Sequence, residues 1–417
     1  MKIIYLHQYF VTPNMSGGTR SYEFAKRLVK MGHEVEMITT WREPSNFKDW
    51  FKTSESGIKV HWLPLIYSNH LNFFQRIKAF IIFAFKASRK AAGLKADIIF
   101  ASSTPLTISL PAVYASKKNK IPLVFEVRDL WPRVPIAMKI LKNSVLCYLA
   151  NLLENWAYKN SQAIIALSPD MKNGVISKNI PSNKIAVIPN CSDLKNFEYN
   201  EDLAKKFRQS RKWLGNRPLL IYTGTFGKVN DLSYAVRLSK ALLKQNSNIR
   251  ILLIGEGLEK EKLINEAINL GVYENNLFFE KQISKRDIQA CLSAADICAN
   301  FVVNIEETWA NSANKFFDGL AAGKPIFLNH GGWMQDLVSY YNCGLCVHGK
   351  TIDKVAEELD LALSNKVWLK NSGKSAKELA KNFFDRDILA QQLEKVLVLT
   401  KKGKTEQVEK IAKGIYT

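Results

Sequence analysis

The chain has 417 residues, enough for two or three domains, and its 47% apolar and 23% charged residues are ordinary for a globular protein. The 13 Pro and 21 Gly exclude collagen-like and low-complexity chains. The apolar run Ala79–Phe85 is much shorter than the roughly 20 residues of a membrane span, and Met1–Leu6 lacks the apolar region of a secretory signal. Six Cys are too few for a disulfide scaffold, so we expect a cytoplasmic protein.

The positive charge is concentrated in the first half of the chain. Residues 1–200 carry 27 Lys and Arg against 13 Asp and Glu, whereas residues 201–417 contribute only +7 to the net charge of +21. This asymmetry indicates an anionic partner: nucleic acid, a phosphate-bearing substrate or a membrane surface. No nucleic-acid-binding motif is present, so we expect no nucleic acid partner.

Segment 69–95 contains six basic residues and no acid. At helical spacing, Phe73, Ile77, Phe80, Ile81 and Ala84 share a face that we expect to be core. Ile82 and Phe83 then fall among the basic residues, as in a helix that lies on anionic lipid. The predicted membrane contacts are Arg76, Lys78, Ile82, Phe83, Lys86, Arg89 and Lys90. The alternative is a solvated basic helix with two chance apolar residues.

Residues 1–200 alternate short apolar runs, typical of buried strands, with helical periodicity. Such alternation indicates a parallel sheet with right-handed crossovers. The predicted strands are Lys2–Leu6, His33–Thr39, Lys59–Pro64, Ile98–Ala101, Pro122–Val127, Ala163–Leu167 and Ile185–Pro189, and the predicted helices are Ser21–Met31, 71–93, 106–117 and 143–159.

The same alternation restarts after a polar stretch that runs to Arg217. We therefore expect an α/β protein with two doubly wound domains, residues 1–195 and 196–384, and ligand at the carboxyl ends of the strands in a central cleft. The predicted strands are Leu219–Gly224, Ile249–Gly255, Leu277–Glu280, Asp296–Val303 and Pro325–Asn329, and the predicted helices are Leu232–Gln245, Glu259–Leu270, Lys285–Ser293, 313–322 and several in the tail from about 352.

The segment from Asn311 to Pro325 has the features of a helix that binds phosphate. Ser312 is a suitable N-cap and Gly323 a suitable C-terminal stop. Asn314 and Asp318 share one face, and Lys315 adds a cation to the positive end of the helix dipole. This pattern favours a pyrophosphate at the N-terminus and ribose hydroxyls at Asp318. The alternative is a well-capped amphipathic helix with a solvated Lys.

Three further segments follow predicted strands. Gly17–Gly18 and Gly224–Lys228 could bring backbone N–H groups and a Lys to phosphate, although each could also be a structural turn. Arg128 and Asp129 could contact a hydroxylated substrate or pair with each other. No His pair has metal-ligand spacing, so we expect no metal and no cofactor.

These pieces together resemble a retaining glycosyltransferase of family 4. The resemblance rests on five segments in order: Tyr5–Val35 with its Ser16-Gly-Gly-Thr-Arg20 loop, Arg128–Pro132, Ile188–Asn190, Ile254–Gly257 and Ala313–Pro325. They are most similar to bacterial enzymes that build O-antigen, capsule and related polysaccharides, including N-acetyl-L-fucosamine transferases.

The resemblance implies a GT-B fold without metal, with acceptor in the first domain and a nucleotide-sugar, most often UDP-linked, in the second. It also implies that 385–417 packs back on the first domain. Asp318 matches the ribose-contacting acid of the family's Glu-x7-Glu motif, whereas Ala310 stands at the first acid, for which Glu306 and Glu307 are the candidate substitutes. Thr225 replaces the family's Arg, Lys228 matches its Lys, and Arg128, beside Asp129, matches the His near the sugar.

The expected reaction pushes negative charge onto the leaving diphosphate, where Lys228, Lys315 and the helix N-terminus would stabilise it. Gly17 and Gly18, with Gly224, Thr225, Ser312 and Asn314, complete the predicted donor site. The basic first domain suggests a lipid-linked acceptor and a peripheral place on the inner face of the cell membrane. Two alternatives stay open: a nucleotide-sugar epimerase of the same fold, and a non-catalytic subunit of a polysaccharide assembly.

Overall fold

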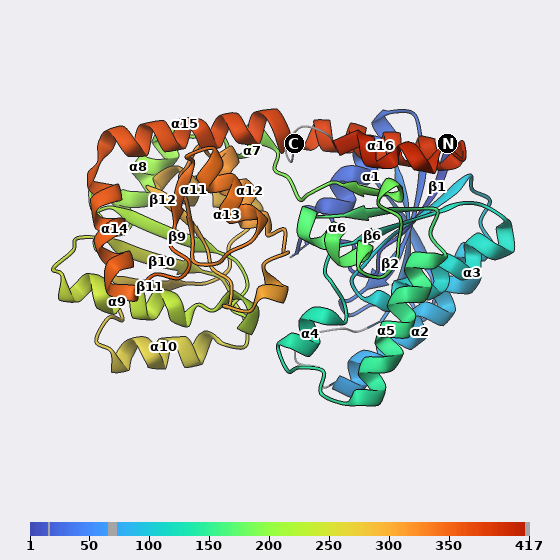
Figure 1. Cartoon of the computed structure of the whole chain (residues 1–417), viewed down its shortest axis with the longest axis horizontal. Helices are drawn as coiled ribbons and strands as arrows, with labels where there is room; N and C mark the ends of the chain where they lie inside the picture. Colours follow the sequence, from blue (N-terminus) through green and yellow to red (C-terminus); the bar gives the residue numbers. More distant parts are fainter. Residues whose placement is uncertain (16, 66–72, 413–417) are drawn as a thin grey trace. The chain divides into compact units, whose positions relative to one another are not determined.

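The computed structural model describes residues 1–15, 17–65 and 73–412. Its contacts divide the chain into two compact units (Figure 1). The first unit comprises Met1–Pro189 and Asp387–Thr417, and the second comprises Asn190–Arg386. The chain thus passes between the units at residues 189–190 and 386–387, against predicted boundaries at 195–196 and 384–385.

The first unit is built on an eight-stranded sheet in the order β3-β4-β2-β1-β5-β6-β7-β8. Every described pair of neighbours is parallel except β3 and β4, so the sheet is mixed. The sequence analysis missed β3, because its alternating polar residues lie half-exposed at the edge. The strands are β1 Lys2–Leu6, β2 Glu34–Trp41, β3 Phe51–Glu55, β4 Ile58–Pro64, β5 Ile98–Ser102, β6 Leu123–Val127, β7 Ala163–Ala166 and β8 Ile185–Val187.

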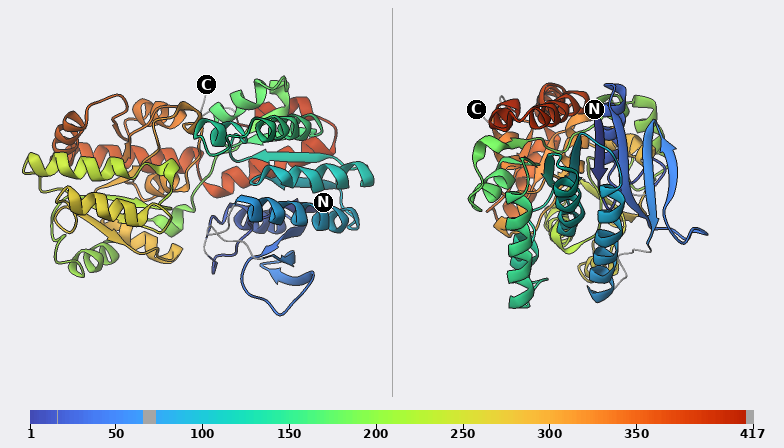
Figure 2. Two further views of the ribbon diagram at one scale, coloured as in Figure 1. Left: turned by 90° about the horizontal axis from the view of Figure 1, so that it is seen from below. Right: turned by 90° about the vertical axis from the view of Figure 1, so that its right-hand side faces the viewer.

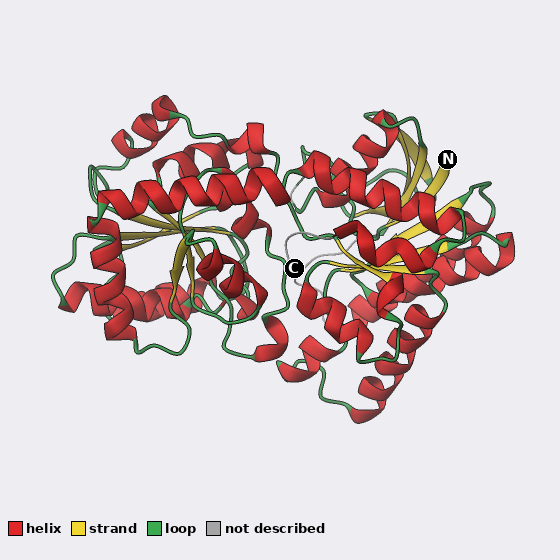
Figure 3. Ribbon diagram, turned by 45° about the horizontal axis from the view of Figure 1, so that its top comes forward, coloured by secondary structure: helices red, strands yellow, loops and turns green. Residues whose placement is uncertain are grey.

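Helices lie on both sides of this sheet, as Figure 3 shows. The central strands β5, β6 and β7 are buried along their whole length, as expected for parallel strands covered on both faces. The described helices are α1 Arg20–Lys30, α2 Phe73–Ala92, α3 Ser109–Asn119, α4 Arg133–Ala137, α5 Ser144–Lys159, α6 Pro169–Ile176 and α16 Arg386–Lys401, with 3-10 turns η1 Leu106–Ile108, η2 Ser182–Lys184 and η5 Thr405–Ala412.

The C-terminal segment belongs to the first unit. Arg27 of α1 pairs with Asp387 of α16 at 2.5 Å, and Nε2 of His33, in the turn after α1, lies 3.2 Å from Glu394. Further along, Lys401 pairs with Asp97. Residues 387–412 therefore complete a unit that begins almost 400 residues earlier.

The second unit is built on a six-stranded, parallel sheet in the order β11-β10-β9-β12-β13-β14. The buried faces of β9, β10 and β12 meet the buried sides of α9 and α14 in one apolar core. The strands are β9 Leu219–Thr223, β10 Arg250–Ile254, β11 Leu277–Glu280, β12 Ile297–Asn300, β13 Ile326–Leu328 and β14 Gly344–Cys346.

Helices also cover both faces of this second sheet. The polar stretch before Arg217 is not a linker, because it contains α7 and α8, and α8 packs along α11. The described helices are α7 Leu194–Phe197, α8 Glu201–Gln209, α9 Ser233–Lys244, α10 Lys260–Asn269, α11 Lys285–Ala294, α12 Asn314–Ala321, α13 Trp333–Tyr340, α14 Ile352–Ser364 and α15 Lys366–Phe383, with 3-10 turns η3 Lys228–Asn230 and η4 Glu306–Thr308.

The structure corrects the predicted faces of α2. Phe83, predicted on the surface, is only 1% exposed, and Ile82 is half-buried. Ile81, predicted in the core, is 58% exposed. The reason is that the buried side is lined by small residues, Ala79, Ala84, Ala87 and Ala91, which let α2 pack closely against α3. Residues 69–72 of the predicted segment and the side chain of Phe73 lie outside the described part.

Within residues 1–15, 17–65 and 73–412, no helix has the length and hydropathy needed to cross a bilayer.

Candidate functional site

The N-terminus of α12 lies next to the loop that follows β9. Helix α12 begins at Asn314, with Ala313 as its N-cap. Ser312 was predicted as the cap, and that prediction is wrong. Its hydroxyl instead accepts a hydrogen bond from the backbone N–H of Asn190 at 3.0 Å, so it fixes the approach to the helix. At the other end Gly323 has φ +65°, the left-handed stop that the sequence predicted.

Lys315 projects from the first turn of α12 toward the β9 loop. Its ammonium donates to Asn230 Oδ1 at 3.2 Å and lies 4.9 Å from the centre of the Tyr222 ring. Its side chain is half-buried, and the protein packed around the ammonium lowers its pKa to about 8. In this region Lys315 has no carboxylate partner in the ion pairs between described residues, so an incoming anion would raise its pKa again.

The loop Gly224–Lys228 follows β9 and lies opposite the N-terminus of α12. The exposed Thr225 directs its carbonyl inward, where it accepts from Tyr222 Oη and Asn230 Nδ2, both at 2.9 Å. Lys228 is exposed at the start of η3. A Cβ placed on Gly224 would lie 2.9 Å from Lys315 Cε, so the two predicted donor segments do come together.

The loop that follows β10 packs against the loop that follows β9. A Cβ on Gly255 would lie 1.8 Å from the carbonyl oxygen of Gly224, so only glycine allows the two backbones to approach so closely. The Ile254–Gly257 motif is therefore a support for the β9 loop, a role that the sequence analysis did not assign.

Asp318 lies one turn into α12, where it is 7% exposed and accepts a hydrogen bond from the hydroxyl of Ser192 at 2.6 Å. Glu306 and Glu307 lie on η4, the first exposed and the second half-buried, whereas Ala310 is buried. A ribose contact at Asp318 and a sugar contact at either Glu remain predictions.

A second polar cluster closes the carboxyl edge of this sheet. Asn300 ends β12 and His330 follows β13, and Asn300 Nδ2 lies 3.3 Å from His330 Nε2. His330 Nδ1 donates to the carbonyl of Gly331 at 2.8 Å. Burial lowers the pKa of His330 to about 4, so the ring is neutral and accepts from Asn300. Neither residue had a sequence signal, since each stands alone after its strand.

The first unit has its own polar cluster at the carboxyl edge of its sheet. Arg128 does not form an ion pair with Asp129 among the described residues; its guanidinium donates to His7 Nε2 at 3.0 Å. Burial and the charges of Arg128 and Arg42 hold the pKa of His7 well below its usual value. His7 is therefore neutral, and its Nδ1–H donates to Ser21 Oγ at 2.7 Å. Asp129 is exposed beside this cluster.

A buried ion pair underlies that cluster. Arg20, 3% exposed, binds Glu126 at 2.8 Å and also donates to the carbonyls of Ile188 and Pro189. Ser102 donates to the other oxygen of Glu126. The sequence analysis missed this pair, because 106 residues separate its members and no spacing links them.

Gly17 and Gly18 are exposed just before α1, and Gly17 has φ +140°. Their neighbour Ser16, part of the resemblance motif, lies outside the described residues. No group of three His, Cys, Asp or Glu side chains in the described part could hold a metal ion. Metal independence stays a prediction.

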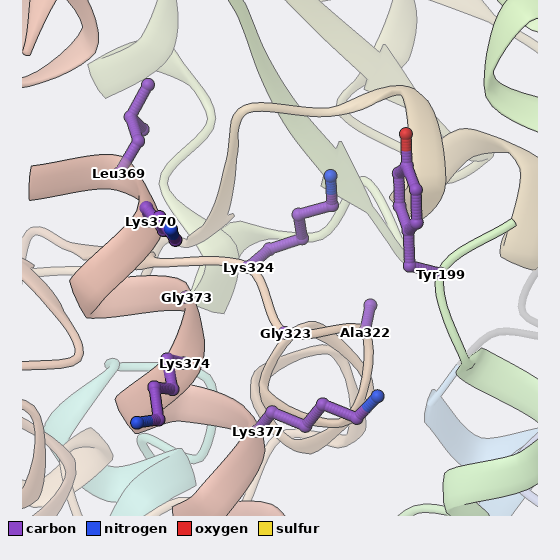
Figure 4. A pocket seen from close by; sticks show the side chains of 9 residues that line it. All are labelled: Tyr199, Ala322, Gly323, Lys324, Leu369, Lys370, Gly373, Lys374 and Lys377. Carbon is purple, nitrogen blue, oxygen red and sulfur yellow. The ribbon is translucent and has the colours of Figure 1, made fainter. Parts of the chain in front are cut away.

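A pocket of about 340 Å³ lies at the opposite end of α12 (Figure 4). It holds four Lys, of which Lys324 donates to the carbonyl of Ser293 at 2.9 Å and lies over Tyr199. None of the predicted donor residues lines it. The lining residues are Tyr199, Ala322, Gly323, Lys324, Leu369, Lys370, Gly373, Lys374 and Lys377.

Family models match both units in turn. Residues 17–196 match Glycosyltransferase Family 4 and residues 204–383 match Glycosyl transferases group 1. The chain is a glycosyltransferase of the GT-B fold. Over 399 residues it is 21% identical to WcaI of Escherichia coli K12, a glycosyl transferase assigned to colanic acid biosynthesis, with 91% of this chain and 96% of WcaI covered.

Solved structures share the fold of this glycosyltransferase at low identity. Sucrose-phosphate synthase from Thermosynechococcus elongatus has a TM-score of 0.74 at 16% identity, covering 95% of this chain and 98% of its own. HepE of Anabaena, solved in complex with UDP-glucose, has a TM-score of 0.71 at 18% identity, covering 95% and 99%. The predicted GT-B fold is thus confirmed for the glycosyltransferase.

Proposed function

We propose that this glycosyltransferase moves a sugar from a UDP-linked donor to a lipid-linked saccharide in the synthesis of a bacterial surface polysaccharide. The observation that carries the proposal is Lys315, a half-buried ammonium at a helix N-terminus beside a glycine loop. UDP-glucose in HepE and the polysaccharide assignment of WcaI support the donor class and the product class.

Donor binding follows from the charges of the second unit. The N-terminus of α12, together with Lys315, favours a diphosphate, and exposed Lys228 adds a second cation. Asp318 would accept from the ribose, and Glu306 or Glu307 would contact the sugar. The resemblance favours an N-acetylated deoxysugar.

Bond cleavage at the anomeric carbon places negative charge on the leaving diphosphate. Preorganised donors stabilise that charge without a metal, and removal of one donor typically costs about 3–4 kcal/mol of transition-state stabilisation. The acceptor hydroxyl attacks from the face that the diphosphate leaves, so configuration is retained. The departing phosphate takes the acceptor proton, so the step needs no protein base. Arg128 and Asp129 would orient the acceptor or the sugar.

The deciding experiment is a thermal-shift screen against UDP, GDP, ADP and CMP, with and without EDTA. A nucleotide at 100 times its Kd adds about 2.7 kcal/mol of stability. We expect a UDP-selective shift that EDTA leaves unchanged, followed by an NMR assignment of the product anomer as retained. A shift with GDP alone would contradict the donor base, and no shift with any nucleotide would contradict the proposed donor site.

A further inference from the structure

Helix α5 presents an apolar face that no described residue of its own unit covers. Five of its side chains are 36–64% exposed, and they follow one another at helical spacing, so they share a single face. They include a Trp and a Tyr, the residues that favour the boundary between lipid and water. The five are Val145, Tyr148, Leu149, Leu152 and Trp156.

The outward faces of α2 and α3 continue this pattern. On α2, Ile81 and Phe85 are 58% and 59% exposed, and the guanidinium of Arg89 covers the Phe85 ring at 4.3 Å. On α3, Leu110 and Tyr114 are 37% and 48% exposed. Helix α3 contacts both neighbours and lies between them in the right-hand view of Figure 2. The three helices therefore form one layer, which we call the α2-α3-α5 face.

Basic residues surround the apolar side chains of this face. The exposed ones are Lys78 and Arg89 on α2, Lys117 and Lys118 on α3, and Lys142 and Lys159 at the two ends of α5. Along the described spans of these helices the only acid is Glu154, which is 2% exposed and paired with Lys178. Lys86 does not count toward the charge, because Asp49 binds it at 3.1 Å.

We propose that the α2-α3-α5 face, centred on α5, docks the enzyme on an anionic lipid bilayer. An anionic bilayer has an apolar interior and negatively charged headgroups, so it matches exposed apolar and aromatic side chains that are surrounded by cations. A second copy of the chain matches less well, because two such faces would bring like charges together. The inference rests on the proposed function in one respect: docking would bring the enzyme to a lipid-linked acceptor in the bilayer.

The test is sedimentation with vesicles of phosphatidylglycerol and phosphatidylcholine, compared with phosphatidylcholine alone. The variant Leu149→Glu/Leu152→Glu places two charges in the centre of the α5 face. The matched control is Leu361→Glu, which changes a 71% exposed leucine on α14 of the second unit. Melting temperatures of all three proteins, and their shifts with UDP, report on folding and on the donor site.

We expect the wild type to sediment with the anionic vesicles, the control to follow it, and the α5 variant to lose about tenfold or more in partitioning. Equal binding by the α5 variant, equal loss in the control, or no binding by the wild type would each overturn the proposal. The molar mass of each protein is also measured by analytical ultracentrifugation without lipid. A mass that is lower only in the α5 variant would overturn the proposal, because it would show that this face binds a second copy of the chain. A UDP shift without vesicle binding contradicts the docking alone, and vesicle binding without a UDP shift contradicts the donor site alone.

Discussion

Protons taken up when UDP binds provide a direct test of Lys315. Burial lowers the pKa of its ammonium to about 8 in the free protein, whereas a bound diphosphate would raise that pKa again. Near pH 8 the ammonium of Lys315 is therefore partly deprotonated in the free protein and protonated in the complex. By linkage, about 0.1 proton is taken up per UDP at pH 7, about 0.5 at pH 8 and about 0.9 at pH 9. UDP affinity therefore falls by about fivefold between pH 8 and pH 9, and the fall approaches tenfold per pH unit only above pH 9.

The assay is titration calorimetry in buffers of different ionisation enthalpy, from which the proton count is obtained directly. UDP itself contributes little at pH 8, because a terminal phosphate has a pKa of about 6. Lys315→Arg keeps a charge that proteins do not titrate, so this variant binds UDP without uptake. Lys324→Arg is the matched control, since burial also lowers the pKa of Lys324, yet Lys324 lies in the pocket at the other end of α12.

The reasoning is refuted if the wild type binds UDP at pH 8 with no proton uptake. It is equally refuted if Lys315→Arg keeps the wild-type uptake, or if Lys324→Arg abolishes it. In each case the ammonium beside Gly224 would not be the group that meets the diphosphate.

Three further outcomes follow from the structure. Glu126→Ala leaves the buried guanidinium of Arg20 without its carboxylate and should lower the free energy of unfolding of the first unit by about 3–5 kcal/mol. Scanning calorimetry should show a lower melting temperature for that unit, and an unchanged melting temperature would contradict the buried pair. Gly255→Ala drives a Cβ into the Gly224 carbonyl and should abolish the UDP shift, whereas Gly271→Ala, which has open space, should keep it. Dialysis against EDTA should leave the transfer rate unchanged, and a loss that Mg²⁺ restores would show that the enzyme needs metal.

The sequence predicts well those strands that are short apolar runs between polar residues. β1 and β11 match their predicted bounds because each is a short apolar run closed by polar residues. The α12 motif and the Gly224 loop are contiguous segments that follow or precede strands, so parallel topology alone brings them to one edge of the sheet. The proximity of Lys315 to Gly224 could therefore be predicted from the sequence alone.

Features that depend on distant partners were not predictable in this way. Arg20 and Glu126 meet only because β6 and the start of α1 are placed together by the whole sheet. In α2 the bulky residues dominated the predicted core face, yet the alanine side is the one buried against α3. The hydroxyl of Ser312 is of the kind that caps a helix, but it accepts a hydrogen bond from the backbone N–H of Asn190 instead. In each case a tertiary contact outweighed a local preference.

The return of the chain to the first unit orders its folding during synthesis. Residues 190–386 can fold as soon as they leave the ribosome, while the first unit still lacks its last piece. Until that piece arrives, the surface that will meet Leu389, Leu393, Val396 and Leu397 is open to water, and these four are fully buried at the end. The domain made first is thus completed last, and a chain cut after Arg386 would carry a finished second unit beside an uncovered first one.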